Sequence, residues 1–137
     1  MPTMEKTQAE ILAEAAREAA GAAPVVKSLL ESAAYALQRG DTAEAQKLLA
    51  PTITCLNFIS QIISTLEQNA GDRLAEIKLD GQNIVAVQSR WIKRLEELKN
   101  SIGANDMVRT ADLLAYEISR EFDCQVDILK RLAEGHA

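Results

Sequence analysis

The chain has few of the residues that build β-sheets or disulfide frameworks. Of its 137 residues only 4% are aromatic, two are cysteine, three are proline and six are glycine. Strands favour aromatic and β-branched residues, so scarce aromatics beside abundant alanine and leucine favour helices. Two cysteines, Cys55 and Cys124, are too few for a disulfide framework, and we interpret both as small core residues. So few prolines and glycines leave room for long helices.

Histidine is almost absent as well, since His136 is the only one. A single histidine cannot supply the Ser-His or Cys-His pair of a nucleophilic enzyme, nor a histidine-based metal site. The chain also lacks a Cys-x-x-Cys pair, the Glu-x-x-His motif of di-iron bundles and a glycine-rich phosphate loop. We therefore expect a protein that is not an enzyme and that binds no cofactor or metal.

Acidic residues outnumber basic ones, and the formal net charge is −5. Nucleic-acid binding rests on neutralising phosphates with basic side chains, so we expect no nucleic-acid partner. The N-terminal residues include no continuous apolar segment of the kind found in signal peptides. Residues 48–66 carry no charge over 19 positions, the length that a bilayer demands. Seven of these 19 are Ser, Thr, Asn or Gln, so we predict a buried central helix, no membrane contact and a cytoplasmic protein.

Apolar residues spaced three and four apart predict five helices. The first has a thin apolar face and ends where Gly21 and Pro24 break it, so we expect it to pack on the outside. Gly40 ends the second helix and Asp41 begins the third, which we predict to be buried on most of its circumference and kinked at Pro51. The predicted ranges are about 7–20, 24–39, 42–69, 84–102 and 107–134.

Residues 72–83 are ambiguous. Asp80-Gly81 is the strongest short signal for a β-hairpin turn, and apolar and polar residues alternate around it. A hairpin this small is marginal alone, so we prefer a loop with a turn at Asp80-Gly81. A short extended segment near 77–84 and a complete hairpin stay open as alternatives. Asn83 is then the expected cap of the fourth helix, and Asp106 that of the fifth.

The two halves of the chain resemble one another when the sequence is shifted by 65 residues. Gly40-Asp41 then meets Asn105-Asp106, and asparagine, like glycine, tolerates a left-handed backbone. Each half, about 24–69 and 83–134, thus contains a helix, a tight joint and a longer helix. We predict one all-α domain over 1–137: an antiparallel four-helix bundle from two helical hairpins, with the N-terminal helix as an outer fifth.

The densest polar pattern, residues 106–117, begins the fifth helix and holds the candidate partner-binding residues. Asp112 and Tyr116 are four apart and share a helix face. We expect Arg109 to pair with Asp112, and Glu117 with Arg120. In one interpretation, Asp112 and Tyr116 join their helix to a neighbour by a buried hydrogen bond. In the other, a partner-binding groove includes Arg109, Asp112, Tyr116 and Glu117.

The same block resembles an uncharacterised bacterial family whose C-terminal half carries Asp-x-Val-x-x-Ala-Asp-x-Leu-x-Tyr-Glu after an Asp-Gly turn. No activity is known for that family, so this resemblance implies none for the chain. The matching residues, in order after Asp80-Gly81, are Asp106, Val108, Ala111, Asp112, Leu114, Tyr116 and Glu117.

A second resemblance covers residues 25–66, with Ala36-Leu37-Gln38-Arg39-Gly40-Asp41 and the isoleucine-rich stretch that follows. This part is similar to the central hairpin of flagellar export chaperones that bind flagellin. The likeness implies a cytoplasmic four-helix bundle that holds helices of a secreted partner in apolar grooves. The N-terminal tyrosine motif of those chaperones is missing from this chain.

Three hypotheses of function follow. The leading one is a non-catalytic helical protein-binding module, a chaperone or adaptor that accommodates an amphipathic helix in an apolar groove. The second is a structural homodimer, in which a second copy of the chain buries the same apolar strip. The third is a carboxylate-dependent enzyme, which needs several acidic side chains converging in one pocket.

Overall fold

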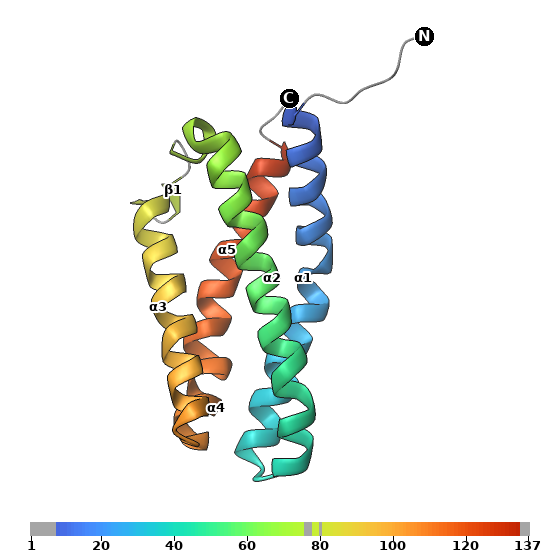
Figure 1. Cartoon of the computed structure of the whole chain (residues 1–137), viewed down its shortest axis with the longest axis vertical. Helices are drawn as coiled ribbons and strands as arrows, with labels where there is room; N and C mark the ends of the chain where they lie inside the picture. Colours follow the sequence, from blue (N-terminus) through green and yellow to red (C-terminus); the bar gives the residue numbers. More distant parts are fainter. Residues whose placement is uncertain (1–7, 76–77, 80, 135–137) are drawn as a thin grey trace.

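The computed structural model describes residues 8–75, 78–79 and 81–134, which fold as an elongated bundle of antiparallel helices (Figure 1). The prediction of an all-α fold is confirmed. The helix start expected at position 7, and His136, lie outside the described residues. The elements are α1 (Gln8–Gln38), α2 (Thr42–Ala75), β1 (Lys78–Leu79), β2 (Gln82–Asn83), α3 (Ile84–Gly103), α4 (Met107–Asp112), η1 (Leu113–Glu117) and α5 (Ile118–Glu134).

α1 is one continuous helix, so the predicted break at Gly21 and Pro24 is wrong. Both residues are exposed, whereas the buried stripe continues past them through Ala19, Ala23 and Val26. Packing of that stripe outweighs the roughly 3 kcal/mol that an interior proline costs. The expected outer helix is therefore the first half of α1. Because α1 packs against α2 on one side and against α4, η1 and α5 on the other, it is the central helix of the bundle.

α2 continues to Ala75, past the end predicted at Asn69, and the prediction that it is buried on most of its circumference is wrong. Thr42–Asn69 is long and apolar enough to cross a membrane, judged by length and composition alone. Only 28% of its apolar 18-residue window is buried. The reason is topological, since α2 packs mainly on α1 and only one side of it faces the core.

The joints between the helices of each half have the same backbone geometry. Gly40 and Asn105 both adopt a left-handed conformation, with φ of 76° and 57°. The following residue donates its backbone N–H to the carbonyl five residues earlier, at 2.9 Å for Asp41 and 2.8 Å for Asp106. Each aspartate then accepts the backbone N–H three residues further on, at 3.1 and 3.0 Å. The predicted equivalence of the two joints is confirmed, because both close a helix and cap the next one.

The segment between the halves is a small hairpin rather than the preferred loop. β1 and β2 pair antiparallel, with Lys78 opposite Asn83 and Leu79 opposite Gln82. Gly81 supplies the left-handed turn residue, with φ of 78°, and Asp80 lies outside the described residues. The predicted cap is confirmed, because the Asn83 Oδ1 accepts the backbone N–H of Ala86 at 3.0 Å.

The last three elements, α4, η1 and α5, follow one another without a break and form a single rod that returns along α3. This rod is not one regular α-helix as predicted. η1 is a single π-helical turn between α4 and α5. A π turn contains one residue more than the α turn that it replaces, so side chains on either side of it are displaced around the rod. Val108, which the α-helical spacing places in the apolar stripe, is 76% exposed. The cap at Asp106 is confirmed.

Trp91 and Phe122 lie at the centre of the core, with ring centroids 6.3 Å apart. The Trp91 Nε1 donates to the Ser60 Oγ on α2 at 2.6 Å. Gln125 on α5 is fully buried, and neither its Oε1 nor its Nε2 has a hydrogen-bond partner among the described residues. The core is therefore apolar except at this amide and at a few bonded polar groups.

Candidate functional site

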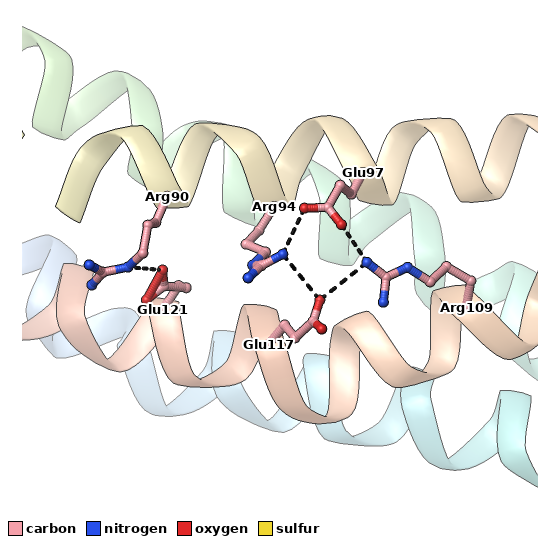
Figure 2. Close-up of polar contacts among 6 residues, drawn as sticks. All are labelled: Arg90, Arg94, Glu97, Arg109, Glu117 and Glu121. Atoms are coloured by element: carbon pink, nitrogen blue, oxygen red, sulfur yellow. Dashed lines mark hydrogen bonds and ion pairs between the residues drawn. The ribbon is translucent and has the colours of Figure 1, made fainter. Parts of the chain in front are cut away.

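Four charged side chains form a closed network between α3 and the returning rod (Figure 2). The Arg94 Nη1 lies 2.8 Å from the Glu97 Oε1 and 3.5 Å from the Glu117 Oε2. The Arg109 Nη2 lies 3.4 Å from the same Glu117 oxygen and donates to the Glu97 Oε2. Two cations and two carboxylates thus alternate around a ring, and their charges cancel.

A further ion pair extends this network towards the hairpin, where the Arg90 Nε donates to the Glu121 Oε2 at 2.8 Å. That hydrogen bond raises the pKa of Arg90. Burial raises the pKa of Glu97, but hydrogen bonds from Arg94 and Arg109 outweigh it, and the net shift is downward. Glu97 therefore stays ionised at neutral pH and has no proton to donate in acid-base chemistry. The arrangement is suited to holding α3 against the rod.

The ion pairs predicted within the fifth helix are wrong. Arg109 contacts carboxylates of α3 and η1 rather than Asp112, and Glu117 contacts two arginines rather than Arg120. The prediction assumed regular α-helical spacing, in which residues three and four apart meet. Arg109 and Asp112 lie three apart within the regular helix α4, so the spacing permits their pairing, but Arg109 reaches Glu97 and Glu117 instead. Figure 2 shows Glu117 directed across to α3.

Asp112 and Tyr116 do not join two helices. Asp112 is exposed and Tyr116 is 65% exposed, so the interpretation as a buried hydrogen bond is wrong. Both side chains lie on the outside of the rod, while Arg109 and Glu117 belong to the network. A role for these residues in binding a partner stays a prediction.

The α1–α2 groove, an apolar hollow of about 260 Å³, is a second candidate site that the polar motifs did not indicate. Phe58 at its rim is 58% exposed, and Ile11, next to the groove residue Leu12, is 53% exposed. Large apolar side chains are usually buried. The groove is lined by Leu12 and Ala15 from α1 and by Phe58, Gln61, Ile62, Thr65 and Leu66 from α2.

The face of α2 beside this groove carries no charge from residue 48 to residue 66. Solvent-facing sides of helices in globular proteins usually carry charged residues. Nineteen residues of helix extend about 28 Å, so the uncharged face is long and one helix wide. Its exposed residues are Ala50, Pro51, Thr54, Phe58, Gln61, Ser64 and Thr65.

Two larger hollows, of about 470 and 580 Å³, lie along α5 and are lined mainly by charged side chains of both signs. Several of these charges are already paired, as in the 2.7 Å ion pair between Lys27 and Asp123. Within residues 8–75, 78–79 and 81–134, no group of three or more His, Cys, Asp or Glu side chains is placed to hold a metal ion. The α1–α2 groove is therefore distinguished by its apolar lining rather than by its size.

Comparison with known proteins identifies a family but no characterised relative. No curated protein and no solved structure matches the chain. A family described as a domain of unknown function (DUF8042) matches residues 14–124, which include all six residues of Figure 2 and most of the α1–α2 groove. Because this match spans most of the chain, the protein belongs to the DUF8042 family.

Proposed function

We propose that this protein is a non-catalytic binding module that holds an amphipathic helix of another protein in the α1–α2 groove. The observation that carries the proposal is Phe58, exposed at the groove on a helix face that lacks charge over 19 positions. Contiguous exposed apolar surface marks interaction sites on soluble proteins. Amphipathic helices bind such grooves through apolar residues spaced three and four apart. A cytoplasmic chaperone or adaptor is the class of protein that works in this way.

The paired charges have a supporting role in this proposal. Arg109 and Glu117 pair with Glu97 and Arg94 of α3, which holds α3 against the rod and fixes the shape of the second hairpin. Asp112 and Tyr116, which face outward, remain candidates for a separate contact with a partner. The groove lies on the first hairpin, so a partner helix in it leaves the charge network in place.

The test uses a fluorescently labelled 18-residue peptide that forms an uncharged amphipathic helix, with leucines on one face and glutamines on the other. We expect the protein to raise the fluorescence anisotropy of this peptide, and Phe58→Glu to weaken the binding at least tenfold, because a carboxylate would be desolvated in the groove. The matched control is Val85→Glu, which places the same charge at a 70% exposed apolar residue of α3. Equal binding by the Phe58 variant and the wild type would contradict the proposal.

A structural homodimer is the alternative occupant of the same surface. Sedimentation equilibrium of the wild type and of Phe58→Glu separates the two hypotheses. A monomer that binds the peptide supports the helix-binding module. A tight dimer that Phe58→Glu dissociates, with no peptide binding, would assign the groove to a second copy.

A further inference from the structure

We infer that the helix held in the α1–α2 groove carries one cationic side chain near its middle and one anionic side chain about three turns away. This inference rests on the proposed function and specifies the partner of the same groove. It follows from two exposed charges, Glu18 on α1 and Lys47 on α2, that flank the apolar surface.

The shape of the surface favours a single helix over a second folded copy. The uncharged face of α2 is about 28 Å long and one helix wide, or roughly 300 Å² in outline. A standard protein interface buries about 800 Å² on each partner. A lone helix of 18 to 20 residues covers the available surface, whereas a globular copy needs contacts beyond it.

Glu18 lies on α1 one helical turn beyond the groove residue Ala15, outside the residues that line the groove. It follows Ile11 by seven residues, two helical turns, so the two side chains share a face of α1. Since α1 and α2 run antiparallel (Figure 1), this places Glu18 roughly level with Phe58 across the groove.

Lys47 directly precedes the uncharged stretch of α2, which begins at residue 48. It precedes Phe58 by eleven residues, which is three helical turns or about 16 Å, so both project from the same side of α2. Lys47 and Glu18 are exposed, and neither forms an ion pair within the part of the chain that the structure describes. The groove and the uncharged face of α2 that continues from it thus have a negative charge beside Phe58 and a positive charge about 16 Å away, at the start of the uncharged face, with no charged residue of α2 between them.

A bound helix reduces the solvation of charges at its edges, so complementary charges are favoured and like charges disfavoured. A bound helix is therefore complementary in charge when it places a cation opposite Glu18 and an anion opposite Lys47. An exposed pair changes affinity by up to about fivefold, and salt screens the effect. Charge therefore sets the register and direction of the helix more than its affinity.

The test compares three 18-residue peptides with the same apolar face and with two charges eleven positions apart. The dipolar peptide carries Lys and Glu, the basic peptide carries two Lys and the acidic peptide two Glu. At low ionic strength we expect the wild type to bind the dipolar peptide about threefold more tightly than either of the others. In 1 M salt the three affinities should converge.

Variants of the protein should change the order of preference in a defined way. Lys47→Glu makes both ends negative and should favour the basic peptide, while Glu18→Lys makes both ends positive and should favour the acidic one. Glu96→Lys, an equally charged change at an exposed residue of α3, is the control and should keep the wild-type order.

The outcomes separate this inference from the proposed function. Equal binding of all three peptides to the wild type, abolished by Phe58→Glu, would overturn the charge assignment and leave the helix-binding groove. Affinities that follow peptide net charge alone in every variant would also overturn it, because the net charge of −5 would then explain them. Absence of binding by any peptide would contradict the proposed function itself.

Discussion

Replacing Gln125 by methionine should stabilise the protein. Gln125 is fully buried on α5, and both polar atoms of its side chain lack a hydrogen-bond partner in the part of the chain that the structure describes. A buried polar group without a partner costs about 1–3 kcal/mol of stability. Methionine has a similar length, no branching and a comparable helix propensity, so it fills the same space without that cost. We expect the free energy of unfolding to rise by about 1–3 kcal/mol.

Urea unfolding, followed by circular dichroism at 222 nm, measures this gain. With a urea dependence near 2 kcal/mol per molar, typical for a small domain, the midpoint should move up by roughly 0.5–1.5 M at constant slope. Gln46→Met, at an exposed residue of α2, is the matched control and should change stability by less than about 0.5 kcal/mol.

The opposite result would refute this reasoning. If Gln125→Met lowers the stability by more than about 1 kcal/mol while the control is neutral, the amide has hydrogen-bond partners in solution. An ordered water between the helices is the simplest such partner. High-resolution crystallography of the wild type would then locate it beside the Gln125 amide.

Three further predictions concern the network, the joints and the centre of the core. Glu97 has a lowered pKa in the folded protein, so its carboxylate stabilises the fold above its ordinary pKa of 4.5, and this contribution is lost as the pH falls through the lower folded value. Glu97→Gln should therefore cost about 1 kcal/mol at pH 7, and urea unfolding at pH 3 should show a smaller cost; an equal cost at both pH values would argue against an ionic role. Gly40→Ala should cost about 1–2 kcal/mol because its φ is 76°, whereas Asn105→Gly should be neutral within about 0.5 kcal/mol; thermal unfolding compares the two, and a neutral Gly40→Ala would contradict the left-handed joint. A double-mutant cycle of Trp91→Phe and Ser60→Ala, measured by urea unfolding, should give a coupling of about 1 kcal/mol; zero coupling would show that the indole bond adds nothing.

Local signals in the sequence predicted the parts of the fold that depend on single residues. Gly40 and Asn105 need a left-handed backbone, and the aspartate after each caps a helix, so both joints were predictable from four residues. Asn83 is a further local signal, because it caps α3 by accepting the backbone N–H of Ala86, three residues away. These features depend on neighbours within a few positions, which is the information that a sequence pattern contains.

Features that depend on packing were not predictable in this way. Pro24 and Gly21 usually break helices, but the alanine-rich stripe buried on both sides of them keeps α1 continuous. The apolar spacing of α2 indicates burial, yet the spacing alone does not tell how many neighbours the helix has. The topology places only α1 fully along it, and Phe58 is left exposed.

The candidate site was likewise predictable only where it depends on local sequence, and not where it depends on packing between helices. The block at 106–117 contains Arg109 and Glu117, which pair with each other, but their further partners Glu97 and Arg94 lie on α3, outside the block. A sequence signal for them exists in retrospect: Arg90 and Arg94 are four apart, as are Glu117 and Glu121. Matching opposite-charge ladders on two antiparallel helices predict cross-helix pairs.

The π turn at η1 also determines how this segment accommodates a change of length. A π turn holds one residue more than an α turn, and in a regular α-helix each residue turns the next side chain by about 100°. Deleting one residue between Leu113 and Glu117 would therefore convert the π turn into an α turn, and the parts of the segment before and after it would keep nearly the same relative orientation. The cap at Asp106 and the buried positions of α5 would stay in place. Deleting one residue within the regular helix α5 would instead rotate the parts on either side by about 100°, so a deletion should be tolerated better at η1 than in α5.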